Sequence, residues 1–77
     1  MVIEIISPDN LIFRGEVDSI ILPGKEGSFG ILNNHAPIIA TLQEGKVSVI
    51  QDGSEKQFDI AGGVVEVLKN KVIVLSE

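Results

Sequence analysis

The residues of this 77-residue chain that could perform acid–base chemistry are one histidine and a pair of carboxylates. His35 stands in the turn-like run 33–37, where a general base could lie, and a single histidine excludes a metal site built from several histidines. Glu16 and Asp18 are two residues apart, so on a strand they would share one face and could exchange protons or hold a hard cation. A loop histidine bonded to the backbone and a solvated sheet face are the simpler interpretations, and we adopt them.

The glycine-rich run 24–30 is the other pattern that suggests a ligand, because backbone amides in such runs can hold a phosphate. It does not match the nucleotide-binding loop, since no Gly-Lys-Ser/Thr opens a helix. We interpret these glycines as residues of a tight connection with positive φ. No serine stands in a nucleophile-elbow pattern, and the absence of cysteine excludes thiol catalysis, thiolate zinc sites and disulfides. The sequence therefore predicts no catalytic site, metal or cofactor.

Composition narrows the class of partner. A formal charge of -5 with carboxylates along the whole chain repels phosphate backbones, which argues against general nucleic-acid binding. The start lacks the basic region of a secretory signal, and no apolar run approaches the roughly 18–20 residues that span a bilayer. A single domain of this size has a marginal core. Without disulfides or a metal, a partner subunit is the expected source of further stability.

The elements that must position these residues are short strands. Turn signals such as Asp52-Gly53 and Lys69-Asn70 separate segments rich in Val and Ile, none long enough for a good helix. This spacing predicts a mainly antiparallel sandwich or barrel in one domain. The nine predicted strands cover residues 2–6, 11–13, 17–22, 28–32, 38–42, 46–51, 56–60, 64–68 and 71–75.

Alternation predicts which side chains face the core. Val47 and Val49 alternate with polar residues, as do Phe58 and Ile60, so each pair should point inward. The run 72–75 is apolar on both faces, as are residues 64–65 and 20–22. Two interpretations stay open for these segments: burial on both sides within the fold, or an exposed apolar patch reserved for a partner.

The run 22–42 carries a set of short motifs in a recognisable order. A Pro-Gly-Lys-Glu-Gly turn begins at Pro23, Phe-Gly-Ile begins at Phe29, and His-Ala-Pro begins at His35, followed by an apolar strand. Ser7-Pro8 upstream and Gly62-Gly63 downstream agree with the same pattern. This ordered set resembles the epsilon subunit of the rotary F-type ATP synthase over nearly the whole chain.

The resemblance implies a ten-stranded β-sandwich of two five-stranded sheets. It implies a non-catalytic central-stalk subunit that links the gamma subunit to the c-ring of a proton-translocating synthase and couples ion flow to ATP synthesis. It also implies a location peripheral to the cytoplasmic side of the bacterial inner membrane, with the stromal side of the thylakoid membrane as the alternative. The gamma-facing surface would include Ser7 and Val74. The end that meets the ring would include Glu26, Gly27, Ser28, Asn33, Asn34 and His35.

Two departures from the family pattern modify these expectations. Ser28 stands where the family commonly has a second acidic residue, and Asn33-Asn34 replaces a Pro-Gly-like pair, so ring contact should be less electrostatic. Most members continue into a C-terminal helical hairpin that can inhibit ATP hydrolysis and in some members binds ATP. The sequence stops at Glu77, so we expect this chain to lack the hairpin, its inhibitory switch and its nucleotide site.

Two other functional classes have features in common with this sequence. A lipoyl or biotinyl carrier domain is also small, acidic and all-β, and Lys69-Asn70-Lys71 invites comparison with its modified lysine. The Asp or Met that usually precedes that lysine is absent at both positions, which disfavours a carrier. A small enzyme would need a deep pocket that brings His35 together with a carboxylate.

Overall fold

The computed structural model describes all 77 residues, which form nine β-strands and no helix. No segment is therefore a helix that could cross a bilayer. The strands are β1 (Val2–Ile6), β2 (Leu11–Glu16), β3 (Ser19–Gly24), β4 (Gly27–Leu32), β5 (Ile38–Leu42), β6 (Gly45–Gln51), β7 (Ser54–Ile60), β8 (Gly63–Leu68) and β9 (Lys71–Ser76).

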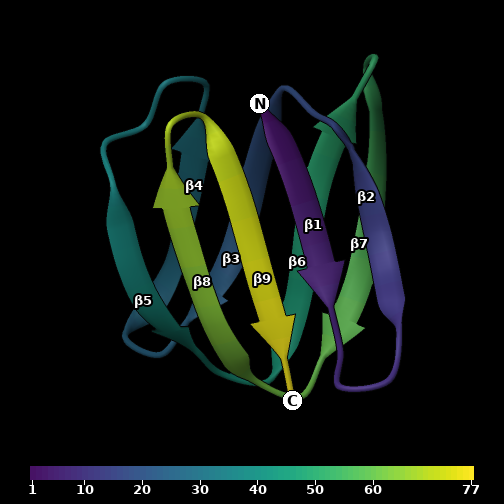
Figure 1. Ribbon diagram of the computed structural model, residues 1–77, viewed down its shortest axis with the longest axis vertical. Helices are drawn as coiled ribbons and strands as arrows, with labels where there is room; N and C mark the ends of the chain where they lie inside the picture. The colour runs from purple at the N-terminus through teal and green to yellow at the C-terminus, as the bar shows by residue number, and fades with distance from the viewer.

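The strands form two layers that face one another (Figure 1). The front sheet has the order β2-β1-β9-β8-β5, and the back sheet has the order β4-β3-β6-β7. A single residue pair, Gly24 with Leu42, connects β3 to β5 and makes the hydrogen-bonded network continuous between the layers. All neighbouring strands are antiparallel except β1 and β9, which run parallel.

The all-β class predicted from the sequence is confirmed, and each of the nine apolar segments forms one strand. The ten strands implied by the family resemblance are wrong for this chain, because the back sheet has four strands rather than five. The longest connection after β3 is residues 33–37, and it does not supply another strand. Asn34 has a φ of 63° there, and Pro37 has no N–H to donate to a ladder.

The core lies between the two sheets. Fifteen apolar residues from Met1 to Val74 form one cluster, and Val47, Val49 and Ile60 belong to it as alternation predicts. Phe58 packs against this cluster from the edge strand β7. Because the pleat sends successive side chains to opposite faces, each strand contributes only every second residue to the core. The remaining apolar side chains must face outward.

The two lateral sides of the sandwich differ. On the side of β2 and β7, the rings of Phe13 and Phe58 lie 4.8 Å apart between centroids, and Gln51 donates a side-chain hydrogen bond to the Glu16 carbonyl. On the side of β4 and β5 no ladder joins the strands beyond the Gly24–Leu42 pair. One side is therefore closed by aromatic packing and the other is open.

Candidate docking surfaces

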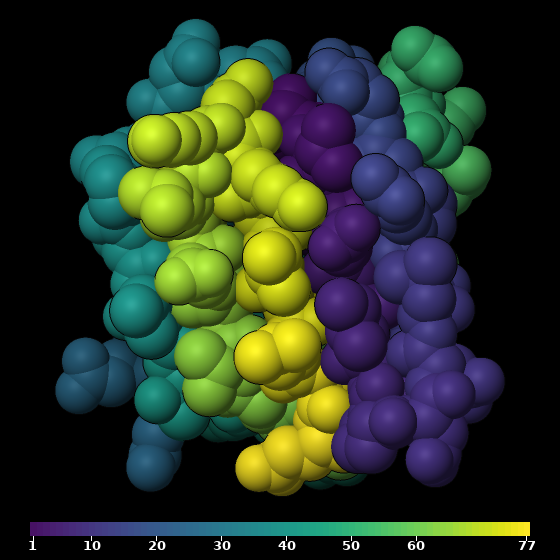
Figure 2. All heavy atoms as spheres, in the orientation of Figure 1, coloured from purple at the N-terminus to yellow at the C-terminus, as the bar shows by residue number.

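The outer surface of the front sheet carries the largest set of exposed apolar side chains. Ile6, Leu75 and Val64 are consecutive partners across β1, β9 and β8, so they form one row. Leu75 is 53% exposed and Val64 39% exposed. Ile39 on β5, 74% exposed, and the half-buried Ile73 on β9 lie in the next row, on either side of Glu66 of β8. We call these five residues the outer apolar face, and Figure 2 views the molecule from the side of β9, β8 and β1 that bears it.

An ion-pair cluster borders this face. The Glu4 carboxylate lies 3.2 Å from Nε of Arg14 on β2 and 3.9 Å from Nζ of Lys71 on β9. Its side chain is largely covered, whereas both cations are about half exposed or more. Pairs of this kind contribute about 0–1 kcal/mol to stability because water screens them. They place a polar boundary beside the apolar row.

The structure decides between the two interpretations of the segments that are apolar on both faces. Val72 and Val74 point into the core, while Ile73 and Leu75 between and beyond them point outward. Ile20 and Leu22 are likewise buried and Ile21 is exposed on the back sheet. These strands therefore do not have both faces buried, and the interpretation as exposed apolar surface holds.

The two residues expected to contact a gamma subunit lie next to this row, but in different environments. Ser7 follows Ile6 in the β1–β2 connection, where its hydroxyl bonds with the backbone of Asn10. Val74 has no exposed surface. A protein that docks on the outer face therefore contacts Leu75, the neighbour of Val74, rather than the Val74 side chain itself. Ser7 and Val74 are thus sequence neighbours of Ile6 and Leu75, and the Val74 side chain is not part of the outer surface.

The six residues expected at the ring do not share one end of the sandwich. Glu26, Gly27 and Ser28 belong to the β3–β4 turn and the start of β4, whereas residues 33–35 follow the end of β4. A six-residue strand spans about 20 Å. Figure 1 shows the two connections at opposite ends of the molecule. The expectation that both supply one contact end is wrong, because an antiparallel hairpin returns the chain to the end from which it started.

The loop that contains Asn33, Asn34 and His35 is held by its own hydrogen bonds. The N-terminal ammonium of Met1 donates to Oδ1 of Asn33 at 2.6 Å, and the backbone N–H of Asn34 donates to Oδ1 of Asn70 at 2.8 Å. His35 Nδ1 lies 2.7 Å from the carbonyl of the adjacent Ala36. Asn33, Asn34 and His35 therefore each have one hydrogen bond within the chain, and His35 is bonded to the backbone as the simpler interpretation predicts.

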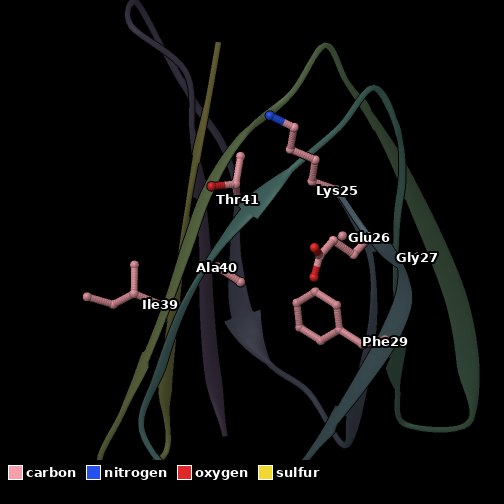
Figure 3. A pocket seen from close by; sticks show the side chains of 8 residues that line it. Lys25, Glu26, Gly27, Phe29, Ile39, Ala40 and Thr41 are labelled. Carbon is pink, nitrogen blue, oxygen red and sulfur yellow. The ribbon is translucent and has the colours of Figure 1, made fainter.

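The β3–β4 turn borders a groove in the surface. A groove of about 430 Å³ lies between β4 and β5 and is lined by Gly24, Lys25, Glu26, Gly27, Phe29, Ile39, Ala40 and Thr41. Phe29 and Ala40 point toward one another across it, whereas Ile39 points away from it (Figure 3). Of the glycines in this run, Gly27 has a positive φ of 131°. The run is a strand–turn–strand, so it presents no helix N-terminus to a phosphate.

The carboxylate pair does not form the arrangement considered above. Glu16 is the last residue of β2, while Asp18 lies in the connection before β3, so the two do not share a strand face. Glu16 Oε1 lies 3.7 Å from the N-terminal ammonium. No three His, Cys, Asp or Glu side chains are grouped as metal ligands would be. The outer apolar face and the groove between β4 and β5 are the surface features that could receive a partner.

The sequence of the whole chain decides the family. Residues 1–77 match the sequence model of the ATP synthase delta/epsilon chain β-sandwich domain. The chain belongs to this family. It is 47% identical over 76 residues to the ATP synthase epsilon chain of Chlorobaculum tepidum, covering 97% of this chain and 86% of that one. It is 43% identical over 75 residues to the epsilon chain of Leptospira borgpetersenii, covering 97% of this chain and 59% of the relative.

Solved structures of the family agree with the fold. A chain of the Euglena gracilis mitochondrial ATP synthase, in an assembly of OSCP, F1 and c-ring, superposes with a TM-score of 0.92 at 25% identity, covering 99% of this chain and 49% of its own length. A chain of the Tetrahymena thermophila mitochondrial ATP synthase central stalk and c-ring gives a TM-score of 0.82 at 17% identity. It covers 97% of this chain and 61% of its own length, and it supports the fold alone. The resemblance to an epsilon subunit is thus confirmed at the level of family.

Proposed function

We propose that the chain acts as a non-catalytic epsilon subunit in the central stalk of a proton-translocating F-type ATP synthase, where it links the gamma subunit to the c-ring. Family membership over residues 1–77 supports the assignment, and the exposed outer apolar face is the observation that carries it. Exposed apolar patches that are rimmed by polar residues are typical of interaction sites. In this role the chain transmits torque while other subunits perform the chemistry, on the cytoplasmic side of a bacterial inner membrane.

The gamma subunit is the partner assigned to the outer apolar face. Ile6, Leu75 and Val64 form a flat row of branched side chains, since β1, β9 and β8 pair in continuous register there. Flat apolar surfaces of this type suit a packed protein interface, whose core is depleted in charge. Burying Leu75, at present half exposed, would contribute about 1 kcal/mol or more at the usual coefficient for apolar area.

The c-ring is the partner assigned to the β3–β4 turn. Lys25 and Glu26 are exposed there, and neither forms a salt bridge within the chain. Polar loops of a ring would therefore find free charges at this end. At the other end Asn33 and Asn34 are engaged in the hydrogen bonds described above. We accordingly keep Glu26, Gly27 and Ser28 as ring contacts and remove Asn33, Asn34 and His35 from that set.

Titration calorimetry of the chain into purified gamma subunit tests the assignment. We expect one-to-one binding with a negative heat-capacity change, because apolar surface is buried. Leu75→Asp should weaken binding by about tenfold or more, whereas Gln57→Asp on the exposed back sheet should change it by less than about twofold. A folded chain that shows no binding to gamma, alone or within the catalytic complex, would contradict the proposal.

Cysteine cross-linking in the assembled synthase tests the orientation. Glu26→Cys should form disulfides with cysteines placed in the polar loops of the ring, while His35→Cys should not, since about 20 Å of strand separates the two ends. The reverse pattern would show that the opposite end of the sandwich meets the ring. Cross-links from both positions would contradict contact through one end.

A further inference from the structure

Four strands, β2, β5, β4 and β7, end the two sheets, and they differ in how their lateral edges are protected. The edge strand β2 contains Arg14 and Glu16, and the edge strand β7 contains Lys56 and Asp59 among its charges. The edge strand β4, Gly27–Leu32, has the sequence GSFGIL, with no charge and no proline. Charged residues and prolines on edge strands prevent pairing with other chains. β5, Ile38–Leu42, is also uncharged, but it follows Pro37 and its end is bonded to the β3 end through Thr41 and Gln43. β4 is therefore the edge that lacks protection along its whole length.

The backbone of β4 presents a defined set of unpaired groups at this edge. The backbone N–H of Gln43 donates to the carbonyl of Pro23, which therefore points away from β4. The facing pair of Pro23 and Ser28 is for that reason a non-hydrogen-bonded pair of the β3–β4 ladder. By alternation Ser28, Gly30 and Leu32 turn their N–H and C=O groups to the free edge. An extended backbone is the partner that pairs with such a row.

Apolar side chains beside this edge are left incompletely covered. Ile38 and Ala40 share a face with Val67 and Val65, which are buried in the core, yet both are only partly buried. Phe29 of β4 is likewise only partly buried. The five strands of the front sheet face only four in the back sheet, so no strand covers the end of the front sheet at β5. The groove of Figure 3 is the resulting space.

We propose that one β-strand of the gamma subunit adds to the free edge of β4, as the fifth strand of the back sheet, and covers the groove. This inference rests on the proposed function. The inward residues of the added strand would be apolar, to cover Phe29 and Ala40. The backbone of the added strand would pair with Ser28, Gly30 and Leu32. The groove meets the outer apolar face at Ile39, so one partner reaches both surfaces.

A second copy of this chain is a poorer occupant of the edge. Each copy has a formal charge of -5, so two copies repel one another, whereas a different polypeptide need not carry that charge. The edge itself carries no ionisable group, which suits an uncharged strand. The occupant is therefore assigned to gamma.

Amide hydrogen exchange, read by NMR on the chain alone and bound to unlabelled gamma, tests the proposal. We expect the amides of Ser28, Gly30 and Leu32 to exchange rapidly in the free chain and at least about tenfold more slowly in the complex, because they then donate to the added strand. The amides of β7, at the opposite edge of the same sheet, serve as the internal control and should not change. Binding without protection of these three amides overturns the strand addition and leaves the proposed function intact.

A proline substitution provides a second, independent measurement. Gly30→Pro removes the N–H that faces the free edge, a position where an edge strand tolerates proline. Gly30→Ala is its matched control, because a Cβ at Gly30 has ordinary van der Waals space. Gly30→Pro should weaken gamma binding by about tenfold and Gly30→Ala by less than about twofold. Equal affinities overturn the inference, as does self-association that protects the same amides without gamma, whereas absence of gamma binding overturns the proposed function as well.

Discussion

Gly63, the first residue of β8, shows how closely the backbones approach where the chain turns from β7 into β8. Its φ is 145°, and a Cβ placed there would overlap the carbonyl of Leu75 on the neighbouring strand. The obstacle is backbone, which cannot rotate away as a side chain can. The substitution Gly63→Ala should therefore lower the free energy of unfolding by at least about 2 kcal/mol.

Urea unfolding followed by circular dichroism measures this effect. Gly53→Ala is the control, because Gly53 also has a positive φ, of 80°, but a Cβ there meets no atom within 4 Å. It should lower the free energy of unfolding by only about 1 kcal/mol. Equal losses for both variants would show that the backbone angle alone, and not the contact with β9, accounts for the requirement at Gly63.

Val74 and Leu75 are adjacent residues with opposite roles. Val74→Ala removes methyl groups from the core and should lower the free energy of unfolding by about 1–3 kcal/mol. Leu75→Ala removes exposed surface and should lower it by less than about 0.5 kcal/mol. Thermal unfolding of both variants, beside their affinities for gamma, separates the two roles. An equal loss of stability would contradict the assignment of Leu75 to the docking surface.

At the scale of elements, Asn70 connects two turns that are far apart in the sequence. It lies in the β8–β9 turn with a φ of 62°, and its side chain accepts the hydrogen bond from the N–H of Asn34. Asn70→Gly keeps the backbone angle but removes the acceptor, so the loop at residues 33–37 should lose order and the free energy of unfolding should fall by about 1 kcal/mol.

Hydrogen exchange at the Asn34 amide reports this contact directly. We expect faster exchange in Asn70→Gly and nearly unchanged exchange in Asn70→Asp, which keeps an acceptor oxygen at the same place. Unchanged exchange in both variants would mean that the loop is ordered by the N-terminal contact to Asn33 instead.

At the scale of the whole molecule, the small core makes stability depend on partners. The core of this 77-residue chain is one cluster of fifteen buried residues. Domains of this size have marginal stability unless disulfides, a metal or a partner stabilise them. A ligand that binds only the folded state adds about 2.7 kcal/mol at a hundredfold excess over its Kd. The midpoint of thermal unfolding should thus rise with gamma concentration, measured by labelling this chain alone. A midpoint that does not move would contradict docking on gamma.

How much of this could be predicted from the sequence depends on the range of the interactions involved. Alternation located the inward residues of β6 and β7, and Asp52-Gly53 located a hairpin whose two φ angles are 51° and 80°. Both depend on neighbours in the chain, since the pleat has period two and a two-residue turn needs positive φ. Alternation could not orient β9, because residues 72–75 are apolar at every position. The family resemblance named Val74 for the gamma-facing surface, and alternation gave no reason to replace it with Leu75.

The sequence by itself determined the all-β class, the nine strand positions, the turns and, through its ordered motifs, the family. Only the tertiary structure decided that residues 26–28 and 33–35 lie at opposite ends, that β9 turns Leu75 outward, and that β4 keeps a free edge beside the groove. The physical reason is that local signals act within a few residues. Strand order, register and the exposed edge arise instead from pairing between segments far apart in the chain, such as β1 with β9 and β5 with β8.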